Sequence, residues 1–100
     1  MKDLLTATRA LLIEKGWCQY TSASPSGAVC LGQAVCLVTE GAGLVAYGPF
    51  AARIASDPFL QERAPQESPS MDRIVRFNDH PLTTREDVLS LLDRVEATMS

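Results

Sequence analysis

Hydrophobic and polar positions follow a helical spacing near the start of the chain. Over residues 3–15 the apolar side chains recur three and four positions apart, which predicts one helix. Asp3 is suited to cap its beginning, and Gly16 is a natural left-handed stop at its end. The predicted inner face consists of Leu4, Leu5, Thr8, Leu11, Leu12 and Lys15.

A second helical pattern covers about residues 84–97, near the end of the chain. Thr83 and Glu86 stand in the spacing of a capping box, with Thr84 and Asp87 as an alternative pair. The apolar stripe of this helix consists of Val88, Leu91, Leu92, Val95 and Met99. We expect the first and last helices to pack together and to clamp the central apolar segment.

That central segment, residues 28–40, fits two structures. The tetrapeptide Ala-Val-Cys-Leu occurs twice around Gly32-Gln33, so the pair could form the turn of a β-hairpin over residues 28–37. The same residues also place Ala28, Leu31 and Val35 on one helical face. The fold expected from the residues is therefore a mainly α bundle of three to four helices, with an α+β fold containing the hairpin as the alternative.

The remaining segments are short or polar. Residues 18–27 are rich in Ser, Thr, Pro and Gly and predict a loop, while residues 41–49 predict a turn or a broken helix end. Pro49 fits the first turn of a short helix that ends before Asp57-Pro58. Residues 61–70 carry two prolines and predict a mobile loop, and residues 74–77 fit a short strand or the end of a helix.

Length, charge and cysteine content narrow the class of protein. One hundred residues, 1–100, correspond to a single domain. A net charge of -3 argues against binding nucleic acid through its phosphates. Three irregularly spaced cysteines are a poor disulfide framework and indicate a reducing compartment. No signal peptide or membrane span is apparent, so we expect a cytoplasmic protein.

The candidate binding loop consists of Phe77, Asn78, Asp79 and His80, just before the last helix. Polar residues held rigidly in a loop often carry function. Asn and Asp also form turns through hydrogen bonds to nearby backbone N–H groups, so a structural turn is the competing interpretation. The sequence favours the structural turn and does not exclude the binding loop.

A metal site and a catalytic cysteine have weaker support in the sequence than the candidate binding loop has. Zinc could in principle be held by Cys18, Cys30, Cys36 and His80, but the spacing differs from the usual zinc motifs. A cysteine nucleophile activated by His80 is possible only on residue count. We therefore expect neither a metal site nor a cofactor.

Several short motifs resemble a family of small uncharacterised proteins of actinobacteria and their phages, a domain of unknown function. The motifs are Gly16-Trp17-Cys18-Gln19, Ala34-Val35-Cys36-Leu37, Phe77-Asn78-Asp79, a threonine at 83 or 84, and Asp87-Val88-Leu89-Ser90-Leu91-Leu92-Asp93. Phe77 stands where the family pattern has Trp and lacks its indole N–H, and Cys36 lacks the Trp often beside it. The resemblance implies a mostly helical fold, which favours the helix over the hairpin, and a bacterial or phage origin. It implies no reaction.

The function expected from these observations is that of a non-enzymatic interaction or regulatory protein, of the kind that phages encode to modulate a host protein. It would then act in the host cytoplasm. The alternative is a small enzyme or metal-dependent domain that uses Asn78, Asp79 and His80. The expected partner is a protein, with no membrane partner, and homo-oligomerisation through an apolar helical stripe stays open. Aromatic side chains available for docking, if exposed, are Tyr20, Tyr47, Phe50 and Phe59.

Overall fold

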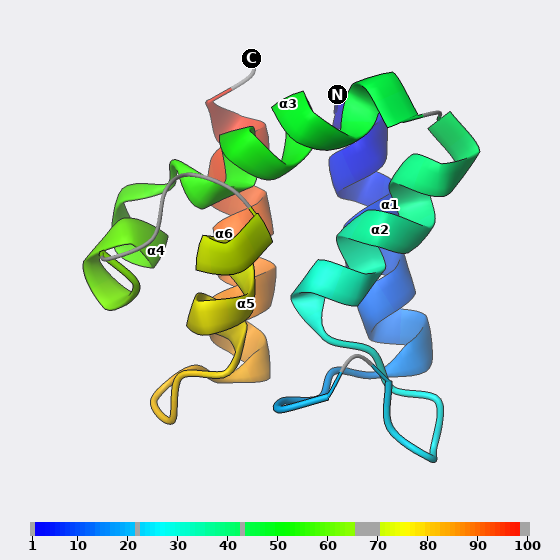
Figure 1. The fold of residues 1–100 in the computed structure, drawn as a ribbon, viewed down its shortest axis with the longest axis vertical. Coiled ribbons are helices and arrows are strands. Elements are labelled where there is room, and N and C mark those ends of the chain that lie inside the picture. Colours follow the sequence, from blue (N-terminus) through cyan, green and yellow to red (C-terminus); the bar gives the residue numbers. More distant parts are fainter. Residues whose placement is uncertain (1, 22, 43, 66–70, 99–100) are drawn as a thin grey trace.

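The structure, a computed structural model, describes residues 2–21, 23–42, 44–65 and 71–98, without the side chains of 41–46. Over these ranges the chain forms six α-helices and no β-strand (Figure 1). They are α1 (Lys2–Lys15), α2 (Leu31–Ala42), α3 (Leu44–Ala55), α4 (Pro58–Arg63), α5 (Met71–Asn78) and α6 (Arg85–Ala97). The predicted mainly α fold is confirmed, whereas the predicted number of three to four helices is too low.

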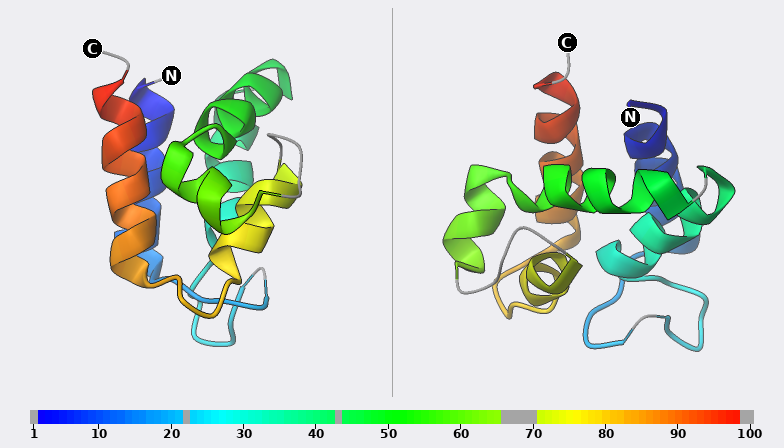
Figure 2. Two further views of the ribbon diagram at one scale, coloured as in Figure 1. Left: turned by 90° about the vertical axis from the view of Figure 1, so that its left-hand side faces the viewer. Right: turned by 45° about the horizontal axis from the view of Figure 1, so that its top comes forward.

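The helices pack around one hydrophobic core. Helices α1 and α6 lie side by side and antiparallel (Figure 2), and α2 packs against α1, α3 and α5. The first and last helices therefore pack together as predicted, but α5 and α3, rather than α6, complete the surroundings of α2. The largest fully buried side chains are Phe50, Phe77, Leu5, Leu12, Leu31, Ile54, Leu60, Ile74, Leu91, Leu92, Val35 and Val88.

The alternative of a hairpin at 28–37 is wrong, because a helix begins at Leu31. Leu31, Ala34 and Val35 are fully buried at the spacing of one helical face, which a hairpin would split between two faces. Cys30 precedes the helix, and its Sγ accepts the Gln33 N–H at 3.2 Å in the manner of a cap. Gly32 lies inside the helix, where its lack of a side chain allows close approach of Met71 and Val75 on α5.

Helix α3 begins earlier than the sequence predicts. Pro49 was expected in the first turn of a short helix, but it lies inside α3, which starts at Leu44. Proline has no N–H for a hydrogen bond within the helix, and this loss is tolerated in the first turn. From the local sequence alone, Pro49 therefore indicates the start of a helix. Gly43 lies outside the described residues.

Two short helices, α4 and α5, lie where the sequence predicts a mobile loop at 61–70 and a short strand or the end of a helix at 74–77. Asp57 begins α4, because its Oδ2 accepts the N–H groups of Phe59 and Leu60 at 3.1 Å each. Residues 61–63 of the predicted loop 61–70 are helical, and residues 66–70 lie outside the described residues. Residues 74–77 belong to α5, so the helical alternative predicted for them is confirmed.

The helix ends follow the predictions in part. Gly16 ends α1 with a φ of +88°, and its N–H donates to the Leu12 carbonyl at 2.9 Å. Asp3 lies within the first turn of α1 rather than capping it. The capping box of α6 is the alternative pair, Thr84 with Asp87, and not Thr83 with Glu86. Four predicted stripe residues of α6 are buried, namely Val88, Leu91, Leu92 and Val95, and Met99 lies outside the described residues.

None of the helices in the described ranges has both the length and the apolar character needed to span a membrane.

Candidate functional site

The candidate site lies where two connections meet at one end of the molecule. The chain leaves α1 at Gly16, and the turn after α5 runs through residues 79–84 into α6, at the same end (Figure 1). We call residues 16–20 together with 77–84 the Asn78 junction. It contains all four residues of the predicted binding loop, and it joins two segments about sixty positions apart in the chain.

Asn78 forms the centre of this junction, and its side chain is completely buried. Its Oδ1 accepts the Trp17 indole N–H at 2.6 Å and the Leu31 backbone N–H at 2.9 Å. Its Nδ2 donates to the Cys18 carbonyl at 3.1 Å and to Asp79 Oδ1 at 3.0 Å. A side-chain amide offers two donors and an acceptor with two lone pairs, and all of these are used here. Asn78 is therefore a structural cross-link among the ends of α1, α2 and α5.

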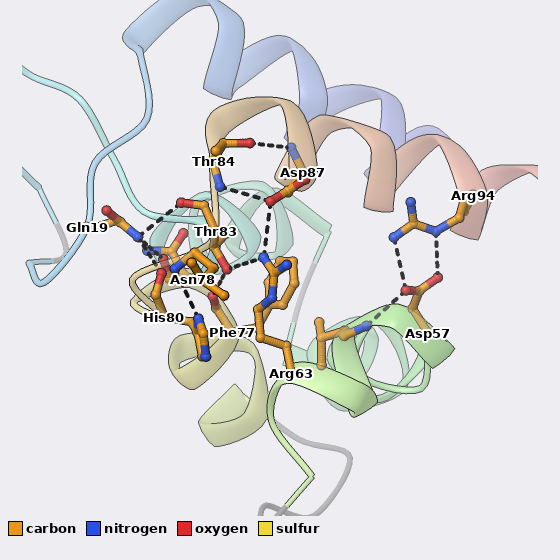
Figure 3. Close-up of polar contacts among 12 residues, drawn as sticks. Gln19, Asp57, Arg63, Phe77, Asn78, His80, Thr83, Thr84, Asp87 and Arg94 are labelled. Atoms are coloured by element: carbon orange, nitrogen blue, oxygen red, sulfur yellow. Dashed lines mark hydrogen bonds and ion pairs between the residues drawn. The ribbon is translucent and has the colours of Figure 1, made fainter.

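Gln19 holds the turn between α5 and α6. Its Nε2 lies 3.0 Å from the carbonyl oxygens of Asn78 and His80 and 3.3 Å from that of Thr83 (Figure 3). The two N–H groups of this amide donate to these three oxygens, with one N–H shared between two of them. The Thr83 hydroxyl donates to the Phe77 carbonyl at 2.7 Å, and His80 Nδ1 accepts the Leu82 N–H at 3.1 Å. One side chain from the first connection thus fixes the path of the second.

Tyr20 stands at the surface of the junction in an unusual backbone conformation. Its φ is +67°, a left-handed value that costs a residue other than glycine about 1–2 kcal/mol. The Tyr20 N–H donates to Asp79 Oδ1 at 2.8 Å, which holds this conformation. Tyr20 is 67% exposed, and Leu82 on the neighbouring turn is 70% exposed. The junction therefore presents two apolar side chains to solvent on a backbone fixed by hydrogen bonds.

Of the other aromatic residues considered for docking, none is presented in this way. Phe50 is fully buried in the core, and Tyr47 and Phe59 are half-buried and pack against it. Phe77 is also fully buried, with its ring edge-on to Phe59 at a centroid distance of 5.9 Å. Phe77 is thus a core residue of the junction and not a residue that a partner could reach.

Arg63 closes the junction on the side of α4. Its guanidinium lies 4.6 Å from the centroid of the Phe59 ring and donates to Thr83 Oγ1 at 2.9 Å and to Asp87 Oδ2 at 3.1 Å (Figure 3). Partial burial acts to raise the pKa of Asp87, but the Thr84 backbone N–H and the Arg63 guanidinium outweigh it, and the pKa is lowered. Asp87 is therefore held as a carboxylate that joins α4 to the start of α6.

The cysteines and His80 do not form a metal site in the part of the chain that the structure describes, where no group of three or more potential ligands converges. Cys30 stands at the start of α2, a position that lowers thiol pKa values in reactive cysteines. Here burial dominates over the backbone N–H groups of Gln33 and Gly32, and the pKa of Cys30 is raised. Burial and the neighbouring Cys30 also raise the pKa of Cys18.

The surface around the junction has two separate depressions. Asp79 lines one of ≈ 580 Å³, together with Asp72, Val75 and Arg76. His80 lines another of ≈ 270 Å³, together with Phe59, Glu62, Arg63 and Leu82. An acid–base pair must converge on one substrate, and these two side chains line different depressions.

The sequence indicated one segment of the junction, residues 77–80, and missed the other segment and the rest of the turn. Of the predicted loop residues, Phe77 and Asn78 are buried, and Asp79 and His80 are half-buried. The partners Trp17, Gln19 and Thr83 were not predicted as site residues. The available signal was the motif Gly16-Trp17-Cys18-Gln19, since both it and Phe77-Asn78-Asp79 carry the family resemblance, and the structure joins them.

Comparison with known proteins assigns the chain to a family without assigning an activity. The chain belongs to a family of unknown function, DUF6197, whose family model matches residues 1–98. No curated protein and no solved structure shows a significant match to it.

Proposed function

We propose that this protein is a non-enzymatic interaction or regulatory protein that binds another protein through the exposed side chains of the Asn78 junction. Tyr20 and Leu82 are the contact residues in this proposal. The finer elements of the proposal are a cytoplasmic location and, where a phage encodes the protein, modulation of a host protein.

One observation carries the proposal: Tyr20 holds a left-handed backbone conformation while the residue is largely exposed to solvent. A strained residue persists only where its surroundings fix it, and such residues cluster at functional sites. Hydrogen bonds from Tyr20 to Asp79 and from Gln19 to the adjoining turn supply that fixation. A rigid surface loses little conformational entropy on binding, which favours affinity.

The composition of this surface fits a protein partner. Tyrosine is among the residues enriched at the centres of protein interfaces, because a large ring and one hydroxyl combine area with a hydrogen bond. Leu82 adds a second exposed apolar side chain, on a turn where His80 Nδ1 accepts the Leu82 N–H. The alternative, a small enzyme or metal-dependent domain, draws no support from the geometry, because Asn78 has no remaining hydrogen-bonding capacity and Asp79 and His80 line different depressions.

The test compares proteins retained from an actinobacterial lysate by immobilised wild type and three variants. Tyr20→Gly removes the ring and keeps the left-handed backbone, and Leu82→Ser removes the other apolar side chain. Ile13→Ser is the matched control, since Ile13 is 47% exposed on α1, outside the junction. We expect one stoichiometric protein that is retained by wild type and Ile13→Ser and lost from the other two. Equal retention by all four proteins, or no stoichiometric protein on folded wild type, would contradict the proposal.

A further inference from the structure

Cys18 and Cys30 occupy neighbouring positions in two chain segments that run parallel. Trp17 and Val29 form a parallel bridge, in which the Val29 N–H donates to the Gly16 carbonyl at 2.9 Å and the Cys18 N–H donates to the Val29 carbonyl at 3.1 Å. This pattern places Val29 opposite Trp17. The next pair in register is Cys18 and Cys30, and in a parallel pairing both side chains point to the same face.

The spacing of such a pair fits a disulfide. Paired parallel segments lie about 4.8 Å apart. Cysteines joined by a disulfide have Cα atoms roughly 4.4–6.8 Å apart. Cys30 also raises the pKa of Cys18, which agrees with this register. Cys36, six positions after Cys30, lies inside α2 and outside the bridged segment.

We propose that Cys18 and Cys30 form a reversible disulfide that locks the Asn78 junction. The carbonyl of Cys18 accepts from Asn78 Nδ2, and Leu31, next to Cys30, donates to Asn78 Oδ1. A bond between the two sulfurs therefore ties together the two segments that hold Asn78. The inference rests on the bridge and the Asn78 contacts and is independent of the proposed function.

The oxidant is a small-molecule disulfide of the glutathione class. The Cys18 thiolate attacks one sulfur of that molecule, whose S–S bond breaks and whose other half leaves as a thiolate. The Cys30 thiolate then attacks Cys18 Sγ, and the second half leaves. Two protein thiols are oxidised, one small disulfide is reduced to two thiols, and the protons of the cysteines pass to the departing thiolates. Cys18 reacts first because it is the more exposed of the two.

Folding and disulfide formation are thermodynamically linked. The folded state therefore raises the equilibrium constant of disulfide formation by the same factor by which the disulfide raises the equilibrium constant of folding. For the loop that a bond between Cys18 and Cys30 would close, this factor is about tenfold or more. Raised thiol pKa values make the exchange slow near neutrality and faster as the pH rises, because the thiolate is the attacking species. The raised pKa values slow the exchange but do not prevent it from reaching equilibrium.

The test is a redox titration of the full chain in glutathione buffers, folded and in urea, followed by alkylation and chymotryptic mapping. Cleavage after Trp17, Tyr20, Leu31 and Leu37 separates the cysteines into peptides 18–20, 21–31 and 32–37. We expect peptide 18–20 linked to 21–31, at a less oxidising glutathione ratio in the folded chain than in urea, and unchanged in Cys36→Ser. Equal ratios in both states, or a link to peptide 32–37, would overturn the inference. The wild-type map decides the matter without any substitution of Cys18 or Cys30.

Discussion

The indole N–H of Trp17 donates to Asn78 Oδ1 at 2.6 Å, a bond between residues 61 positions apart. Trp17 follows the end of α1, and Asn78 is the last residue of α5. The bond joins two of the short motifs that carry the family resemblance. An indole therefore reaches Asn78 from the end of α1.

Replacing Asn78 by Ala should strongly destabilise the fold. The change leaves the Trp17 indole N–H, the Leu31 N–H and the Cys18 carbonyl without their partner, and each buried orphan costs about 1–3 kcal/mol. We expect a loss of at least about 3 kcal/mol in the free energy of unfolding, measured in urea. Trp17→Phe should cost less, because Asn78 Oδ1 keeps the Leu31 N–H. Costs that add fully in the double variant would show that the two side chains are not coupled.

Replacing Tyr20 should reveal the strain of its backbone. Tyr20→Gly removes an exposed ring and relieves the left-handed conformation, so we expect the free energy of unfolding to stay within about 1 kcal/mol of wild type. Tyr20→Val places a β-branched residue at positive φ and should lower it by about 1–2 kcal/mol. Thermal unfolding of the two variants measures the difference. Equal stability of Gly and Val at this position would mean that Tyr20 is not held at positive φ in solution.

Asp87 should make a pH-dependent contribution to stability. Its pKa in the folded protein is lowered from the ordinary 3.8, so its stabilisation is present above that value and is lost as the pH falls through the folded pKa. Asp87→Asn should therefore cost about 1 kcal/mol at neutral pH and almost nothing in strong acid.

Urea unfolding of wild type and Asp87→Asn at a series of pH values measures this contribution. Asp93→Asn is the matched control on the same helix, because Asp93 pairs with Arg9 at the surface and should change stability little at any pH. A cost of Asp87→Asn that stays constant down to about pH 2 would contradict the assignment.

Two helical glycines should respond differently to alanine. At Gly48 in α3 an added Cβ meets nothing within 4 Å beyond its chain neighbours. Gly48→Ala should therefore gain up to about 0.5–1 kcal/mol of helical preference, reduced by crowding of the new Cβ against the Pro49 ring. At Gly32 in α2 the added Cβ lies 3.1 Å from Met71 Sδ and 3.3 Å from Val75 Cγ2, which must shift. We therefore expect Gly32→Ala to be less stable than Gly48→Ala by about 1 kcal/mol. Equal gains in thermal unfolding would show that α2 and α5 are not closely packed at Gly32.

Part of the fold could be predicted from local sequence. Helices α1 and α6 have regular apolar spacing, and Gly16 marks the end of α1, so each is specified by its own residues. The errors fall where a residue type has two local meanings. Pro49 fits a helix start as well as a helix interior, and the threonines at 83 and 84 each stand three positions before an acidic residue. The Thr83 hydroxyl donates to the Phe77 carbonyl, so it is not used to cap the helix. The Thr84 hydroxyl accepts the Asp87 N–H instead and caps α6.

The candidate site depended far more on the tertiary structure. Residue types alone indicated that Asn78 and Asp79 form a polar turn, and a structural turn was the favoured interpretation. They could not indicate that Asn78 is buried or that its partners are Trp17 and Leu31, because contacts across the fold leave no periodic pattern in the chain. Local propensity thus determined where the first and last helices lie. Burial and hydrogen bonding between distant segments decided the helix at 31–42 and the junction around Asn78, since a buried amide is stable only where other parts of the chain satisfy it.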